Sequence, residues 1–188
     1  MARVGLDSDA VVAAAAELAD AEGLKAVTLA RLSSDLGVRA PSLYSHVAGL
    51  DDLRRRIALR GAGELAAALQ AAVAGRARGD ALSALADAYR AYALAHPGTY
   101  AALQRAPAAD DPAAAGAAAD VVEVVLAVLR GYELEGDAAL HATRVIRAAL
   151  HGFVSLETGG GFGLPLALDD SFAALVVLLD GGLAGPRA

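Results

Sequence analysis

Cysteine is absent from this chain of 188 residues, which excludes disulfides, thiolate metal sites and cysteine nucleophiles. Long apolar runs are also lacking, because stretches such as Phe172–Leu179 fall far short of the ~20 residues that span a membrane. The first residues lack the apolar core of a signal peptide. We therefore expect a cytoplasmic protein with no membrane partner.

Strand signals are missing as well. Runs of β-branched residues are short, whereas alanine, the strongest helix former, is abundant. The chain has no internal repeat, and it is long enough for one or two domains with a sizeable core. We predict an all-α fold.

The charge is unevenly distributed. The net charge is −6, but residues 1–60 carry eight basic and eight acidic side chains, so the whole acidic excess lies in residues 61–188. Nucleic-acid binders usually carry a basic patch. Any non-specific affinity of this chain for DNA should therefore be weak and sensitive to salt.

The most informative stretch is residues 28–47. Leu29, Leu32 and Leu36 have the spacing of one helix face. Thr28 can cap this helix with its hydroxyl, and Gly37 can end it with a left-handed turn. The pattern predicts a short helix followed by a tight turn.

A second short helix should begin near Pro41, whose fixed φ suits a first helical turn. Leu43 and Val47 give it an inward face, and Ser42, Tyr44, Ser45 and His46 are left outside. Two such helices form a helix-turn-helix motif, whose second helix enters the DNA major groove. An ordinary helical hairpin is the alternative.

At these residues the sequence resembles the TetR family of bacterial transcriptional repressors. The matching residues are Val27-Thr28, Leu32, Leu36-Gly37-Val38, Ala40-Pro41-Ser42-Leu43-Tyr44 and His46-Val47. The resemblance begins earlier, in the pattern formed by Ala19, Glu22, Gly23, Val27, Thr28 and Leu29. It implies an N-terminal three-helix DNA-binding domain over residues 1–50, with its motif at 28–47. A C-terminal helical bundle for effector binding and dimerisation would occupy residues 51–188.

The resemblance also implies roles for single residues. Thr28, Tyr44 and His46 would contact phosphates, and Arg39, Ala40, Pro41 and Ser42 would lie where base edges are reached. Ser45 belongs to the same DNA-binding set, but it stands where relatives often have a bulkier side chain, so we expect a weak DNA contact from it or none.

One departure concerns the start of the next long helix. Leu50 takes the place where the family usually has a lysine near a phosphate, and Asp51 and Asp52 follow. The i, i+4 spacing predicts the ion pairs Asp51–Arg55 and Asp52–Arg56. Two interpretations of Arg54, Arg55 and Arg56 stay open: they compensate for the missing lysine, or they form a solvated charged face.

Helical periodicity predicts further elements along the chain. In the first half of the chain we expect a helix over 8–22 with Ser8 as its cap, one from about 50 to 74, and one over 80–95 with Asp80 as its cap. In the second half we expect a short helix at Tyr100 and Leu103, one that contains 120–130, and two more over 137–158 and 172–179. Residues 106–114 and 159–165 should be loops. The last helix is apolar almost all round, so it should be buried on more than one face.

The C-terminal part adds a second resemblance. His151-Gly152-Phe153, together with His96-Pro97-Gly98, resembles one TetR C-terminal type, although Ala148 and Ala149 stand where many relatives have tryptophan. The family pairs its last two long helices with those of a second subunit. Residues 137–158 and 169–182 would form this homodimer interface, with simple packing inside one chain as the alternative.

The resemblance further implies a small-molecule pocket in the C-terminal bundle. Its candidate lining residues are Tyr92, Tyr100, Leu103, Val125, Leu129, His151 and Phe153. For His151 and the two tyrosines, an ordinary core residue is the alternative, and it is the stronger interpretation of His151. We predict no cofactor and no metal site.

We therefore predict a ligand-responsive repressor that binds double-stranded operator DNA, near-palindromic in sequence, as a homodimer. A helix-turn-helix protein that binds another protein is the first alternative. The second is a helical-bundle enzyme with His151 and Glu157 as an acid–base pair. These two residues are six apart on one helix and so lie on different faces, and no nucleophile or metal set accompanies them.

Overall fold

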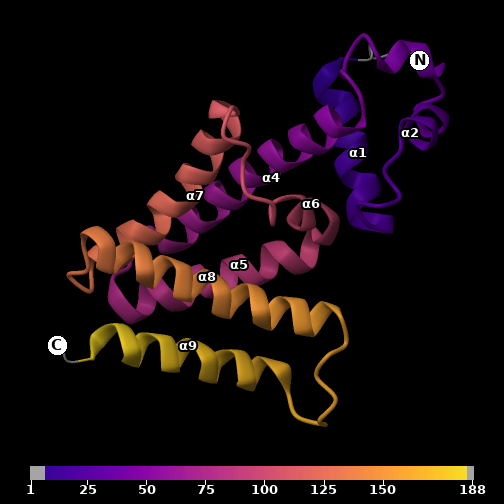
Figure 1. Cartoon of the computed structure of the whole chain (residues 1–188). Helices are drawn as coiled ribbons and strands as arrows, with labels where there is room; N and C mark the ends of the chain where they lie inside the picture. The colour runs from indigo at the N-terminus through magenta and orange to yellow at the C-terminus, as the bar shows by residue number, and fades with distance from the viewer. Residues whose placement is uncertain (1–6, 186–188) are drawn as a thin grey trace. The chain divides into compact units, whose positions relative to one another are not determined.

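The computed structural model describes residues 7–185, and within that range every regular element is an α-helix (Figure 1). The all-α prediction is confirmed. The chain forms two compact units. The first contains the residues up to Gly63 and Ala95–Ala118; the second contains Glu64–Leu94 and the residues from Ala119 onward. These units follow from spatial contacts, whereas the division into residues 1–50 and 51–188 is functional and stays a prediction.

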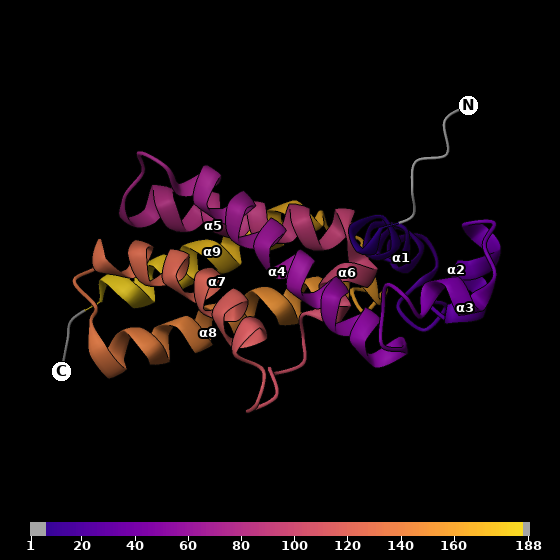
Figure 2. The same ribbon diagram turned by 90° about the horizontal axis from the view of Figure 1, so that it is seen from above.

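The first unit is built around the N-terminal helices. It holds α1 (Ser8–Glu22), α2 (Leu29–Asp35), α3 (Ala40–Leu43), the first part of α4 (Leu50–Val73), α6 (Pro97–Ala102) and the start of α7 (Pro112–Arg130). The helices α2 and α3 lie next to each other (Figure 2). Their buried core comprises Val11, Ala15, Leu18, Val27, Leu32, Leu43, Val47, Leu53 and Ile57, among others.

The start of α1 differs from the prediction by one residue. Asp7, not Ser8, is the N-cap, and its carboxylate accepts a hydrogen bond from the Ala10 N–H at 2.7 Å. The Ser8 hydroxyl instead donates to the carbonyl oxygen of His46 at 3.2 Å. Both side chains can cap a helix, so sequence alone does not choose between neighbouring candidates.

The second unit contains the longer helices. They are the remainder of α4, α5 (Arg78–Ala95) up to Leu94, the remainder of α7, α8 (Gly136–Thr158) and α9 (Leu168–Ala184). Helical spacing predicts that Leu82, Leu85, Ala86, Tyr89, Tyr92 and Ala93 share the inward side of α5, and the structure confirms it, since all six are buried. The helix starts at Arg78, so Asp80 lies in its first turn and is not its cap.

The last helix is longer than predicted and begins earlier. Its N-cap is Ala167, and Asp169 and Asp170, which as acidic residues could cap a helix start, lie in its first turn and make no capping hydrogen bond. Within the described chain only Phe172 and Val176 of α9 are buried. Val177 and Leu178 are 70% and 73% exposed, so the expected burial on several faces is not reached within one chain.

The helix α7 has the length and apolar composition of a membrane span, the one described helix that does. Uninterrupted apolar runs do not indicate this helix, because Asp120 and Glu123 lie within it. One helix of this kind is weak evidence for a membrane segment, since helices of soluble proteins can share its composition. The two carboxylates would also be costly in a hydrocarbon core.

Candidate nucleic-acid interface

The helix-turn-helix of the first unit forms as its caps and turn residues dictate. Thr28 has an extended backbone, and its hydroxyl accepts a hydrogen bond from the Arg31 N–H at 3.1 Å, which starts α2. Gly37 has a φ of +64°, a conformation that glycine adopts without steric cost. The turn is closed by the Val38 N–H, which donates to the Ser33 carbonyl at 2.9 Å. The predicted cap and turn are confirmed.

The second helix of the motif, α3, is short. Arg39 is its N-cap residue, and Pro41 lies in its first turn. The regular helix ends at Leu43, and the chain continues as a turn in which the Val47 N–H donates to the Leu43 carbonyl at 3.0 Å. Leu43 and Val47 are buried as predicted. One side of this segment is therefore fixed to the core.

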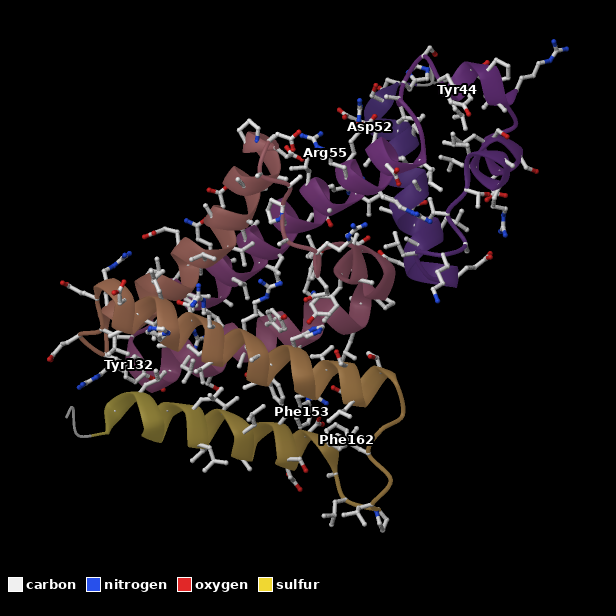
Figure 3. The ribbon with its side chains drawn as sticks, viewed as in Figure 1. Tyr44, Asp52, Arg55, Tyr132, Phe153 and Phe162 are labelled. Carbon is white, nitrogen blue, oxygen red and sulfur yellow. The ribbon has the colours of Figure 1, made fainter. Side chains whose placement is uncertain are left out.

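The opposite side of the segment faces solvent. Arg39, Ala40, Pro41, Ser42, Tyr44 and Ser45 are exposed, and His46 is half-buried. Tyr44 is 60% exposed and lies at the surface (Figure 3). The Ser45 hydroxyl donates to the carbonyl oxygen of Ser42 at 2.7 Å, so it is occupied within its own turn. The backbone thus presents six consecutive or nearly consecutive side chains to an outside partner.

Several cations of this unit are already paired with acids. The Arg31 guanidinium contacts the carboxylates of Glu22 at 2.7 Å and Asp35 at 2.9 Å. Hydrogen bonds from Arg31 to Glu22 and then to Asp35 raise the pKa of Arg31. By contrast, none of the ion pairs among the described residues involves Arg39. The guanidinium at the start of α3 is therefore the better placed of the two for an external anion or base.

One of the two ion pairs that the spacing predicted for α4 forms, and the other does not. Arg56 contacts Asp52 at 3.0 Å, which confirms one i, i+4 pair. Arg55 turns away from Asp51 and binds Asp111, where its Nη2 donates to Oδ1 at 2.6 Å. The hydrogen bond from Arg55, and next that from the Ala114 N–H, lower the pKa of Asp111 to about 2. Sequence reasoning missed this pair because its members are 56 residues apart.

At the start of α4, the carboxylate of Asp52 accepts a backbone hydrogen bond. Asp52 accepts a hydrogen bond from the Ala48 N–H at 2.9 Å. Burial alone would raise the pKa of Asp52, but the Ala48 N–H and Arg56 outweigh burial, and the pKa is lowered. The Asp52 carboxylate thus takes a backbone donor near the helix start, where an unpaired N–H favours phosphate. Leu50, beside it, brings no charge.

An unpredicted contact joins α1 to α6. The Asp20 carboxylate accepts a hydrogen bond from the Thr99 N–H at 2.7 Å and lies 3.0 Å from Nδ1 of His96. A Cβ on Gly98 would lie 1.9 Å from the Ala19 carbonyl oxygen. The sequence indicated His96-Pro97-Gly98 only as a helix break. The structure shows that α6 lies directly on the backbone of the helix that forms the core of this unit.

The candidate effector residues are divided between the two units. Tyr92, Val125, Leu129, His151 and Phe153 belong to the second unit, and Tyr100 and Leu103 to the first. All are buried except Leu103 and His151, which are half-buried.

Polar contacts account for two of them: the Tyr92 hydroxyl donates to Glu64 at 3.2 Å, and His151 Nε2 lies 3.4 Å from the Ser155 hydroxyl. A groove of about 540 Å³ on α1 and α4 contains none of the seven, and their role in ligand binding stays a prediction. Within residues 7–185 no three acidic or histidine side chains converge as a metal site would require.

Comparisons with known proteins agree with this architecture. Residues 82–179, more than half of the chain, match the family model described as "Tetracyclin repressor-like, C-terminal domain". A similar protein is Rv0681 of Mycobacterium tuberculosis, an uncharacterized HTH-type transcriptional regulator. It is 39% identical over 179 residues, which cover 95% of this chain and 82% of that protein.

Solved structures are similar over nearly their whole length. A protein of unknown function from Rhodococcus sp. RHA1 superposes with a TM-score of 0.82 at 25% identity, covering 97% of this chain and 98% of that one. A TetR variant from Acinetobacter baumannii in complex with minocycline gives a TM-score of 0.68 at 23% identity, covering 96% of each chain. Together with the helix-turn-helix geometry, these matches show that the chain belongs to the TetR family of DNA-binding transcriptional regulators.

Proposed function

We propose that this TetR-family regulator is a cytoplasmic, ligand-responsive repressor that binds a near-palindromic operator as a homodimer. The observation that carries the proposal is the exposed segment 39–46, held from behind by the buried Leu43 and Val47. A rigidly seated helix start with small side chains can approach the edges of base pairs closely. The functional division into a DNA-binding part, 1–50, and an effector part, 51–188, belongs to this proposal.

Each exposed residue of the segment has a proposed role. Arg39 would read guanine through two hydrogen bonds, and Ala40 and Pro41 would contact a thymine methyl. Thr28, Tyr44 and His46 would hold phosphates and so position the protein without reading sequence. Ser45 contributes less, because its hydroxyl is bonded to the Ser42 carbonyl.

The homodimer is supported by apolar surface that one chain leaves uncovered. Residues 137–158 and 169–182, which lie in α8 and α9, carry exposed Val145, Leu156, Val177 and Leu178. Large apolar side chains that stay exposed on two helices in contact favour an interaction surface. A two-fold pair would present two recognition helices about one DNA turn (~34 Å) or somewhat more apart, which requires a near-palindromic operator.

The effector proposal rests on family likeness. The minocycline complex shows that a protein of this fold binds a small molecule. In this chain Tyr92, Val125, Leu129, His151 and Phe153, with Tyr100 and Leu103, would line the corresponding site. An effector with higher affinity for the state that does not bind DNA would release the operator by a shift of populations.

Fluorescence anisotropy with the DNA upstream of the protein's own gene tests the DNA-binding proposal. We expect tight, competitor-resistant binding that weakens from low to high salt. Arg39→Ala should weaken operator binding by ~1–3 kcal/mol. Arg76→Ala, which removes an exposed cation between α4 and α5, is the matched control and should leave it unchanged.

The alternative of a protein-binding helix-turn-helix has one observation in its favour. Arg31, Arg55 and Arg56 are paired with acids of the same unit, which lowers the positive charge that this unit offers to DNA. Selection from random DNA separates the two functions. If no sequence is enriched, and if Arg39→Ala and Tyr44→Ala leave DNA affinity unchanged, DNA binding through this segment is refuted.

A further inference from the structure

The loop between α8 and α9, residues 159–167, is rich in glycine but also carries large apolar side chains. Four of its nine residues are glycine, yet it carries Phe162, Leu164 and Leu166. Leu164 is 76% exposed and Leu166 is 70% exposed. Two such side chains within three residues form apolar surface that water solvates poorly. Folding both leucines inward would remove this apolar surface from water and stabilise the chain. In this structure they stay exposed.

The loop is instead anchored by an aromatic cluster. Phe162 and Phe153 lie close together (Figure 3), with their ring centroids 4.9 Å apart. The ring centroid of Phe172 lies 5.0 Å from that of Phe153. These are all three phenylalanines of the chain. Aromatic pairs at such separations contribute beyond their buried area. The middle of the loop is thus held on α8 and α9, while its leucines point elsewhere.

Arg90 of α5 contacts the phenylalanine cluster and the acidic residues that flank the loop on either side. Its guanidinium carbon lies 4.9 Å from the ring centroid of Phe172. It donates two hydrogen bonds to Glu157, at 2.8 and 2.5 Å, and one to Asp169 at 2.7 Å. Glu157 belongs to the last turn of α8 and Asp169 to the first turn of α9. Because Arg90 and Glu157 are mostly buried, solvent screens this bidentate pair weakly.

The loop is continuous with the exposed side of α8. Gly161 packs so closely on Leu156 that a Cβ there would lie 2.8 Å from the leucine Cδ2. Leu156 and Val145 are eleven residues apart, about three helical turns, so they share one side of α8. Both are exposed. A chain that covers Val145 and Leu156 therefore also reaches the loop.

We propose that the loop 159–167 is a third element of the homodimer interface, in which Leu164 and Leu166 pack against a second copy of this chain, and that Arg90 positions it. This inference rests on the proposed homodimer and extends it beyond α8 and α9. A second copy is the favoured occupant because the loop continues the exposed apolar side of α8, which carries Val145 and Leu156 and belongs to the proposed homodimer interface. Nucleic acid and an anionic membrane are disfavoured because Asp170, and Asp169 beside it, expose carboxylates next to the loop. Those carboxylates would repel a negative surface.

Sedimentation equilibrium of the full chain tests the loop. The double variant Leu164→Ser with Leu166→Ser should raise the dimer dissociation constant at least tenfold, with an unchanged helical circular dichroism spectrum. Leu94→Ser, which alters an exposed leucine on α5, is the matched control and should leave the constant unchanged. Val177→Ser with Leu178→Ser tests the helical part of the interface separately.

The outcomes are distinguishable. If the α9 variant dissociates the dimer and the loop variant does not, the loop proposal is overturned and the homodimer stands. If the wild-type chain is monomeric at tens of micromolar, both are overturned. If all three variants weaken the dimer equally, the loop has no specific role and the proposal is also overturned.

A second pair of variants tests Arg90. Arg90→Met removes its ion pairs but keeps much of its length, and it should raise the dimer dissociation constant and speed hydrogen exchange in residues 159–167. Arg90→Lys keeps the charge without the bidentate geometry and should rescue only partly. If Arg90→Met lowers only the unfolding midpoint and leaves the dissociation constant unchanged, Arg90 is structural and its positioning role is refuted. Glu157→Gln replaces the methionine variant if that variant does not fold.

Discussion

Replacing Gly98 with alanine probes the contact that fastens α6 to α1. A Cβ at this position would lie 1.9 Å from the carbonyl oxygen of Ala19, 2.1 Å from its carbonyl carbon and 2.7 Å from the backbone nitrogen of Asp20. All three are backbone atoms, so no side-chain rotation relieves the overlap. The two helices must separate by at least about 1 Å, because real Cβ contacts essentially never fall below 3.0 Å.

The cost of this separation follows from two terms. Overpacking of a close contact costs ~1–3 kcal/mol. The same movement would break the 2.7 Å hydrogen bond from the Thr99 N–H to the Asp20 carboxylate, a charged bond whose loss costs ~1.5–3 kcal/mol. Alanine regains up to ~1 kcal/mol through its helix propensity. The sum is a loss of ~2–5 kcal/mol of unfolding free energy, a large part of the ~5–15 kcal/mol of an ordinary domain.

Urea unfolding followed by circular dichroism, at one fixed protein concentration, measures this loss. Gly116→Ala in α7 is the matched control, because no atom lies within 4 Å of the added methyl group. It should stabilise the protein by ~0.5–1 kcal/mol. If Gly98→Ala stays within ~0.5 kcal/mol of the wild type while the control behaves as expected, the steric argument is refuted.

Three further changes have defined outcomes. Leu50→Lys restores a cation beside the start of α4 and should tighten operator binding and steepen its salt dependence by about one phosphate contact; equal anisotropy slopes for both proteins would contradict this. Tyr132→Phe removes the hydroxyl that donates to Asp180; burial and this hydrogen bond raise the pKa of Tyr132, so the hydroxyl stays protonated. The variant should lose ~1–3 kcal/mol of unfolding free energy in urea, and a loss below ~0.5 kcal/mol would show that the bond is not formed. Because the pKa of Asp111, about 2, lies below the ~3.9 of an unfolded aspartate, its carboxylate stabilises the fold above about pH 4, and this contribution is lost as the pH falls through about 2. Asp111→Asn should therefore be less stable than the wild type at pH 6, the difference should shrink steadily between pH 4 and pH 2, and a pH-independent difference would refute the assignment.

Local signals predicted the helices well. The period of Leu82, Leu85 and Tyr89 gave the buried face of α5, and Thr28 and Gly37 gave the limits of α2 and its turn. Such features depend on residues within one or two helical turns, where spacing and backbone preference decide the structure. Helix starts were less certain, because neighbouring residues such as Asp7 and Ser8 compete for the same capping role.

Long-range polar contacts were outside the reach of the sequence. Arg55 had a partner at the correct spacing in Asp51, yet it binds Asp111. Arg90 and Glu157 are 67 residues apart, and no local pattern connects them. Within the candidate interface, the exposure of residues 39–42, Tyr44 and Ser45 followed from the inward side chain of Leu43. The pairing of Arg31 and Arg55 with acids could not be predicted in this way. Which cations stay available to DNA is decided by tertiary pairing and not by the count of basic residues.

If the proposed homodimer covers the exposed leucines and valines of α8, α9 and their loop, the stability of each chain depends on how much of the protein a cell makes. A chain whose apolar surface is covered only by its own copy gains stability from mass action, so its unfolding midpoint should rise with its concentration. Newly synthesised chains that have not yet met a partner would be the population at risk of aggregation and proteolysis. For such a regulator, expression level would set the pool of folded protein as well as operator occupancy, and a small change in synthesis would alter both together.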